Sequence, residues 1–351
     1  MTPDSLDSFR NVKHIDQKRQ EVWVQYQNQV VELQKLIEQQ SQTDQAFKVD
    51  FISIDDLLKL SNAKKFNIKN LQESLYIPIN QFSTIRIQCV DGGLPLANKL
   101  LQGGNECGID DDHTLVICTP GSRALERHRR AFEKAVLLLA LKIPGITKIQ
   151  VTSHEECGAV MAKLIQRYGS VTHEEANREA VGSAGDLAQD LNEFLNLFGP
   201  ILFSNNYRNI EIEESGLITL NSMSRKEGIH PEFYTFLRRM NLDSENPRNT
   251  IPHTSNVVEL LGVKGFGLAD IGNPFDVAQS AALTANIAIN GPEGMGAKFI
   301  TPENPFIFFI ETPTLNDSIT YIRDTKLRIS TALKEFIISE DLVKFIGVKS
   351  Y

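Results

Sequence analysis

The sequence predicts an α/β fold, in which a mainly parallel sheet is flanked by helices and preceded by an N-terminal helical arm. Three short strand-forming segments, at 84–89, 114–118 and 148–152, are interleaved with an amphipathic helical pattern at 127–142. Strands that alternate with helices in this way are typical of a parallel sheet with helices on its faces. The segment 23–37, before the first of these strands, has apolar residues at helical spacing.

The N-terminal region is predicted to be helical. Its apolar residues recur at intervals of three and four, which places them on one stripe of a helix. The stripe consists of Trp23, Tyr26, Val30, Leu33 and Ile37. About two heptads are too short for a free-standing coiled coil, so this helix is expected to dock on the body of the protein or on a second subunit. A second helix is expected over 53–65, with Ser53 as its N-cap.

The chain beyond residue 170 repeats the order of strand, glycine-containing turn, apolar helix and strand. Three segments carry this repeat, namely 216–225, 265–289 and 305–317. In the same order, they resemble the strand that ends at Cys89, the next strand with its helix, and the segment around His154. The repetition predicts a degenerate second copy of the fold, with Asn221 or Ser222 near the place of Cys89 and without metal ligands.

Composition and charge exclude several classes of protein. The chain has 351 residues, of which 41% are hydrophobic and 23% charged, as in ordinary soluble globular proteins. Its net charge of −8 disfavours non-specific binding to nucleic acid. It contains neither an apolar stretch of about 18 residues nor an apolar signal-peptide core. We therefore expect a cytoplasmic protein that binds neither nucleic acid nor a membrane.

Soft metal ligands lie where the predicted strands end. The four cysteines are too few for a disulfide scaffold, so metal binding or burial must explain them. His154 and Cys157 are three residues apart at a strand-to-helix junction, so both side chains can point at one metal ion. Cys89 ends another strand of the same predicted sheet, and the carboxyl ends of parallel strands share one edge. Imidazole and thiolate are ligands that Zn²⁺ prefers.

These residues carry a resemblance to a known family. The motifs "CVD" at 89–91 and "SHEECGAV" at 153–160, joined by "KAVLLLALKIPGITKIQV", resemble the β-class carbonic anhydrases over residues 84–166. The resemblance implies that Cys89, His154 and Cys157 are ligands of Zn²⁺. It also implies that Asp91 accepts a hydrogen bond from zinc-bound water.

The implied function is the reversible hydration of CO₂ to bicarbonate by zinc-bound hydroxide. CO₂ and bicarbonate would be the substrates, and Zn²⁺ the single cofactor. The N-terminal helical part and the metal-free second half also resemble the carboxysomal branch of the β-carbonic anhydrases. The resulting domains are an N-terminal helical region at 1–75, a zinc-binding carbonic anhydrase-like domain at 76–170 and a second α/β half at 171–351.

One position departs from the family's Cys-x-Asp-x-Arg loop, because Gly93 stands where the family has the Arg that pairs with the Asp. Without that Arg, Asp91 could turn and become a fourth zinc ligand, which would close the site. Alternatively, Arg123 or Arg86 could hold it. Other functions therefore stay open: a zinc-binding protein with a structural or regulatory role, a hydrolase of a CO₂ analogue such as carbon disulfide or carbonyl sulfide, and a metal-free interaction domain.

The resemblance also implies self-association. Members of the family pair as dimers or build larger even-numbered assemblies, with the N-terminal helix reaching across. We therefore expect a homodimer or a higher even oligomer. With two related halves, one chain could also imitate such a dimer by itself, with one working site in place of two.

Overall fold

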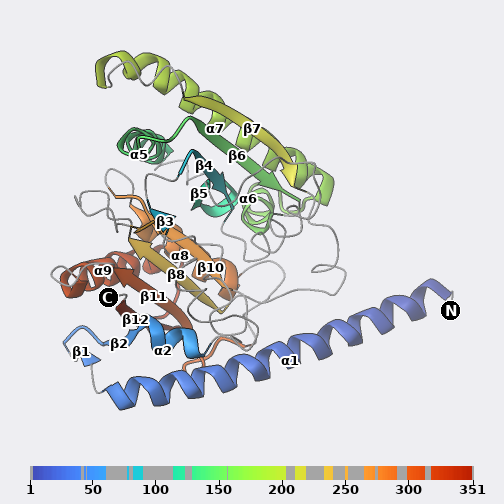
Figure 1. Cartoon of the computed structure of the whole chain (residues 1–351). Coiled ribbons are helices and arrows are strands. Elements are labelled where there is room, and N and C mark those ends of the chain that lie inside the picture. The colour runs from blue at the N-terminus through green and yellow to red at the C-terminus, as the bar shows by residue number, and fades with distance from the viewer. Residues whose placement is uncertain are drawn as a thin grey trace.

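This α/β protein contains two mainly parallel sheets flanked by helices (Figure 1). The three strands predicted from the sequence are all found in the first of these sheets. The computed structural model describes residues 3–40, 43–44, 46–60, 77–78, 82–89, 114–122, 129–155, 157–202, 210–218, 233–239, 250–251, 265–272, 276–290, 299–312 and 318–349. The predicted fold class is therefore confirmed. Among the helices of these residues, none is both long enough and apolar enough to cross a membrane.

The first sheet has four parallel strands in the order β5-β4-β6-β7. The strands are β4 (Thr84–Gln88), β5 (Thr114–Cys118), β6 (Lys148–His154) and β7 (Glu211–Ile218). The short 3₁₀ turn η4 (Pro120–Ser122) follows β5, and the helices are α5 (Arg129–Lys142), α6 (Gly158–Tyr168) and α7 (His173–Leu202). The β-branched residues Ile85, Ile87 and Val151 are buried in this sheet, as expected of strands covered on both faces.

The second sheet has six strands in the order β1-β2-β12-β11-β8-β10, and all neighbours are parallel except β1 and β2. The strands are β1 (Thr43–Asp44), β2 (Val49–Ser53), β8 (Tyr234–Arg239), β10 (Phe266–Asp270), β11 (Phe306–Thr312) and β12 (Val343–Lys349). The helices are α8 (Val277–Asn290), α9 (Ser318–Glu335) and the 3₁₀ turn η8 (Glu340–Leu342). The strands β3 (Ile77–Pro78) and β9 (Thr250–Ile251) form a separate two-stranded antiparallel sheet.

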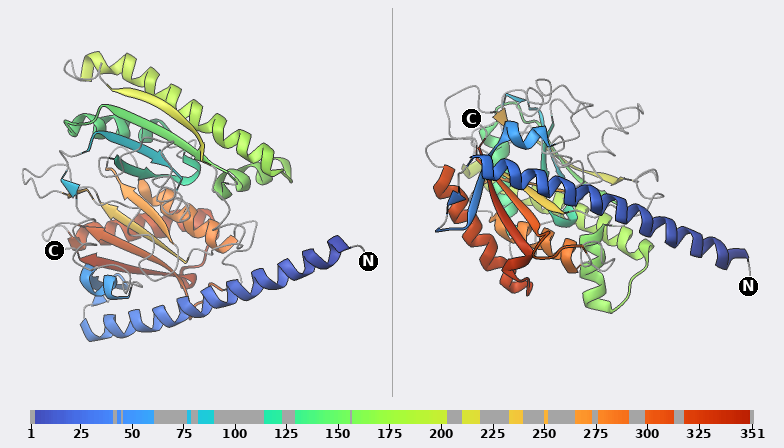
Figure 2. Two further views of the ribbon diagram at one scale, coloured as in Figure 1. Left: turned by 45° about the vertical axis from the view of Figure 1, so that its right-hand side comes forward. Right: turned by 90° about the horizontal axis from the view of Figure 1, so that it is seen from below.

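The N-terminal helix α1 (Pro3–Gln40) packs on the second half through part of its length. Tyr26 is buried, stacks on Phe233 with ring centroids 4.2 Å apart and donates a hydrogen bond to the Pro305 carbonyl at 2.8 Å. The predicted docking of this helix on the body is thus confirmed. Its N-terminal end projects away from the rest of the molecule (Figures 1 and 2).

The predicted second helix is shorter than expected. It is α2 (Ile54–Lys59), and residues 61–65 of the predicted range lie outside the described residues. The Ser53 hydroxyl accepts a hydrogen bond from the Asp56 backbone N–H at 3.1 Å, which confirms the predicted N-cap.

The second half repeats the topology of the first. The order β5-β4-β6-β7 of the first sheet corresponds to β10-β8-β11-β12 in the second, with α5 and α8 in equivalent crossovers. The equivalent edge strands β5 and β10 contact each other, which is how two copies meet in an isologous dimer. The topology is that expected of a second copy of the fold, and a degenerate duplication stays a prediction.

One assignment within that copy was wrong. The segment 216–225 was expected to be the first strand of the second half, but residues up to Ile218 belong to β7, the last strand of the first sheet. The true counterpart of β4 is β8, because β4 lies between β5 and β6 and β8 lies between their equivalents, β10 and β11. Asn221 and Ser222 lie outside the described residues.

Sheet membership does not follow the predicted domain limits at residues 75 and 170. The strand β2 joins the second sheet from the N-terminal region, and both α7 and β7 pack with the first sheet. The domain limits themselves stay predictions.

Candidate metal centre

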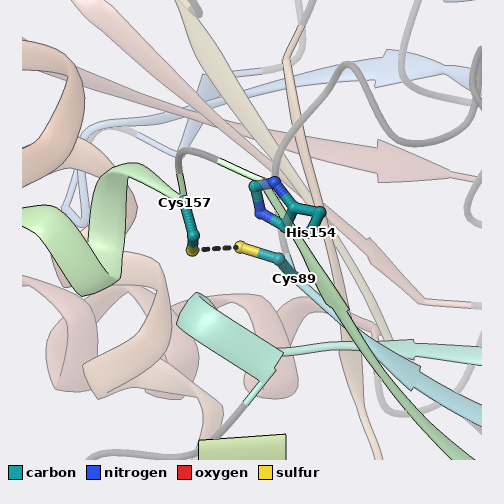
Figure 3. Close-up of side chains that lie close together, drawn as sticks. All are labelled: Cys89, His154 and Cys157. Atoms are coloured by element: carbon teal, nitrogen blue, oxygen red, sulfur yellow. Dashed lines mark hydrogen bonds between the residues drawn. The ribbon is translucent and has the colours of Figure 1, made fainter. Parts of the chain in front are cut away.

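Three ligating side chains meet at the carboxyl edge of the first sheet (Figure 3). Cys89 follows the last residue of β4, His154 ends β6, and Cys157 is the N-cap residue of α6. Their exposed fractions are 3%, 1% and 1% in that order. Because β4 and β6 are parallel neighbours, their ends bring residues 65 positions apart in the sequence to one place.

The donor set and its spacing fit a zinc ion. The Sγ atoms of Cys89 and Cys157 are 3.5 Å apart, and one ligand atom from each of the three side chains lies within 4.8 Å of the others. Tetrahedral zinc, with Zn–S near 2.3 Å and Zn–N near 2.0 Å, sets its ligand atoms roughly 3.5 to 3.8 Å apart. The sulfur separation is too long for a disulfide, whose S–S bond is about 2.05 Å. Within the described residues, this is the one cluster that meets the requirements for holding a metal.

A backbone carbonyl orients the imidazole of His154. Its Nδ1 lies 2.9 Å from the Glu155 carbonyl oxygen, which can only accept, so Nδ1 carries the proton and donates. The lone pair of the neutral ring is then on Nε2, which is buried. The register of β6 against β7 shifts between Val151 and Ser153, an irregularity of the kind that re-aims side chains beside functional sites.

The turn η4 supplies a hydrogen bond to one of the sulfurs. The Gly121 N–H donates to Cys89 Sγ at 3.2 Å. Gly121 has a φ of 66°, a conformation that glycine adopts without the steric cost of a side chain. A Cβ at this position would lie 3.4 Å from Val160 Cγ2, so the turn also packs closely against the first residues of α6. A donor at this sulfur stabilises its thiolate form.

In the absence of metal, the surroundings of Cys89 favour the protonated form of its thiol. The neighbouring Cys157 thiol raises the pKa of Cys89 well above its ordinary value, and burial acts in the same direction. The thiolate is the form that binds metal, so metal binding must release protons and its affinity must rise with pH.

Some residues proposed from the sequence are not placed at the site. Asp91, Gly93 and Arg123 lie outside the described residues. Arg86 is buried, but it precedes Cys89 by three residues on the same strand, so alternation directs it to the opposite face of the sheet. The sequence did not single out Gly121 as a donor to sulfur, although the glycine in "TPGS" marked a turn there.

Comparison of the chain with models of known protein families, with curated proteins and with solved structures gave no match in any of the three cases. The parallel α/β fold and the cluster of Cys89, His154 and Cys157 are compatible with the resemblance to β-carbonic anhydrases. The function must therefore be inferred from the chemistry of the cluster.

Proposed function

We propose that this chain is a zinc-dependent lyase of the carbonic anhydrase type, which interconverts carbon dioxide and bicarbonate. The observation that carries the proposal is the buried cluster of Cys89, His154 and Cys157 at the carboxyl edge of a parallel sheet. Three protein ligands leave the fourth position of tetrahedral zinc for water or substrate, which is the ligand count of catalytic zinc sites. A homodimer or higher even oligomer stays a prediction of the same resemblance.

The side chains of the cluster would bind the ion, and the groups around them would tune it. When bound, zinc acts as a Lewis acid that lowers the pKa of a coordinated water toward neutrality. The thiolates of Cys89 and Cys157 cancel the ion's formal charge and so weaken this effect. The Gly121 N–H would withdraw electron density from the Cys89 sulfur. It would thereby partly restore the ability of the ion to lower the pKa of the water. Asp91 is proposed to accept a hydrogen bond at the fourth position and to orient the nucleophile there.

A second function is favoured by the burial of all three ligands. Exposed fractions of 1% to 3% are compatible with a closed, structural zinc site, in which a fourth protein ligand replaces water. Asp91 would be that ligand, because Gly93 stands in place of the Arg that would otherwise hold it. The chain would then bind zinc and serve a structural or regulatory role without hydrating carbon dioxide.

Stopped-flow hydration of CO₂, on protein whose zinc content has been measured, tests the proposal. We expect one zinc per chain and a hydration rate that is proportional to zinc content between pH of about 6.5 and 9. The variant Cys157→Ser should lose both zinc and activity, because it removes one thiolate of the cluster. Cys107→Ser, which changes a cysteine that the sequence does not predict to be a ligand, is the control and should keep both.

The other outcomes separate the candidate functions. Stoichiometric zinc without activity at any pH would overturn the lyase proposal and favour the closed site. Protein that takes up no zinc under reducing conditions would overturn both.

A further inference from the structure

Thr119 is a buried polar side chain at the end of β5. Its exposed fraction is 0%, and its Oγ1 has no hydrogen-bond partner among the residues that the structure describes. A buried hydroxyl without a partner is destabilising, and native proteins satisfy nearly all such groups with protein, water or ligand. Thr119 therefore needs a partner from outside the described protein groups.

The register of the sheet places Thr119 beside the metal cluster. Gln88 pairs with Cys118, and the Thr119 N–H continues this ladder by donating to the Gln88 carbonyl at 2.9 Å. Cys89 and Thr119 are therefore adjacent on neighbouring strands, and their side chains share a face of the sheet. Two residues later, Gly121 contacts the Cys89 sulfur, so the turn after Thr119 folds over the cluster.

The second half has a polar side chain at the same place. Asp270 is paired with Arg239 and precedes Gly272 by two residues, as Thr119 precedes Gly121. There the carboxylate is satisfied: it accepts from the Tyr321 hydroxyl at 2.7 Å and from the Gly272 N–H at 2.9 Å. The equivalent position thus directs a polar group to the carboxyl edge in both halves. Asp270 has its hydrogen-bond partners there, whereas the Thr119 hydroxyl has none among the described residues.

We propose that the Thr119 hydroxyl donates a hydrogen bond to the anionic ligand that fills the fourth position of the metal. The inference rests on the proposed metal site, and it deepens the proposed function by naming a residue that positions the ligand. A hydroxyl donor favours small anions with a lone pair on the metal-bound atom or next to it, as in bicarbonate. Thr119 would therefore tune which ligand binds without holding the metal itself.

Azide binding to the cobalt-substituted protein tests this inference independently of catalysis. Co²⁺ accepts the same ligand types as Zn²⁺, and its visible spectrum changes when an anion enters its coordination shell. Azide would be titrated into the full-length wild type and into Thr119→Val and Thr119→Ser. Thr114→Val, which alters a buried threonine at the opposite end of β5, is the matched control.

The expected result is azide affinity five- to tenfold weaker in Thr119→Val, which is about the size of one neutral hydrogen bond. Thr119→Ser and Thr114→Val should stay within about twofold of wild type, and the affinity for Co²⁺ should be the same in all. Equal azide affinity in wild type and Thr119→Val would overturn the inference. If Thr119→Val does not fold, Thr119→Ala, which also lacks the hydroxyl, decides by the same criterion.

The measurement also distinguishes this inference from the proposed function. Weaker azide binding in Thr119→Val, together with no hydration of CO₂ by the wild type, would support Thr119 and reject the lyase. Failure of the wild type to bind Co²⁺ would reject the metal site and Thr119 with it.

Discussion

The two halves of this protein share one topology and close the same edge of it by different chemistry. In the first half, Cys89, His154 and Cys157 meet there as a set of metal ligands. In the second, Arg239 takes the place of Cys89, and its guanidinium lies 4.7 Å from the centre of the Tyr321 ring, which bonds to Asp270. One edge carries a candidate metal site, and the polar groups at the other are satisfied by its own side chains.

The comparison indicates that the polar groups at this edge need hydrogen-bond partners, and that the fold can supply them without a metal. The ends of three parallel strands and the start of a helix gather polar backbone groups at one place, and these must be satisfied. In the second half, Asp270 accepts from the Gly272 N–H, whereas the equivalent Gly121 N–H donates to the Cys89 sulfur. Among the described residues, the candidate metal site therefore lies at this edge of the first half, where the second half uses hydrogen bonds of its own side chains and backbone.

Removal of metal should have the largest effect, and it should be confined to one half. Structural zinc contributes on the order of 10 kcal/mol of apparent binding free energy, part of which stabilises the elements that it joins. After treatment with a chelator, we expect amide hydrogens in β6 and at the start of α6 to exchange at least about tenfold faster. Those in β10, α8 and β11 should exchange as before, as hydrogen-exchange mass spectrometry would report.

The two outcomes are well separated. Equal acceleration in both halves would mean that the metal supports the whole molecule, and the halves would then be one cooperative unit. As a control, the same chelator should leave the exchange of Cys157→Ser unchanged, because that variant has no metal to lose.

The next largest effect concerns the second half. Tyr321→Phe removes the hydrogen bond to the buried Asp270 and keeps the ring beneath Arg239. Loss of a bond to a charged group should lower the free energy of unfolding by roughly 1.5 to 3 kcal/mol. Tyr168→Phe, on an exposed tyrosine of the first half, should change it by less than about 0.5 kcal/mol. Chemical denaturation of metal-loaded protein measures both.

The same variant should alter the alkaline limit of stability. Burial, and then the charge of Asp270, raise the pKa of Tyr321 well above its ordinary value of about 10. The stabilisation is therefore complete below pH of about 10 and is lost as the pH rises further, because the unfolded chain ionises first. The fall in stability above pH 10 should be shallower in Tyr321→Phe. Equal slopes in the two proteins would contradict the role of Asp270 and Tyr321.

The sequence was sufficient to predict that Cys89, His154 and Cys157 lie close together, because the signals that place them are local. Cys89, His154 and Cys157 each follow directly from a strand or precede a helix, and parallel pairing then joins their positions. The sequence was not sufficient to predict which residues occupy the equivalent positions in the second half. Strand propensity identifies 216–218 as strand but does not tell which sheet it joins, so β7 was taken for the first strand of the second half. Arg239 and Asp270 could be matched only after the strand order was known.

The smallest expected effect comes from the glycine of the equivalent turn in each half. Gly121 and Gly272 have φ of 66° and 79°, so alanine at either position costs about 1 kcal/mol in backbone strain. A methyl group at Gly272 meets nothing within 4 Å, whereas at Gly121 it meets Val160 and Ala159 of α6. Gly121→Ala should therefore also shift the donor to Cys89 Sγ and the helix that begins beside Cys157.

The measurement that compares these variants is zinc affinity by competition with a chromogenic chelator. We expect Gly272→Ala to bind zinc as the wild type does and Gly121→Ala to bind it about tenfold more weakly, as for other changes around metal ligands. Both should lose similar stability in the metal-free state, because the strain is the same. If both variants keep full zinc affinity, the Gly121 N–H does not tune the cluster. The difference between the halves then lies in the ligating side chains alone.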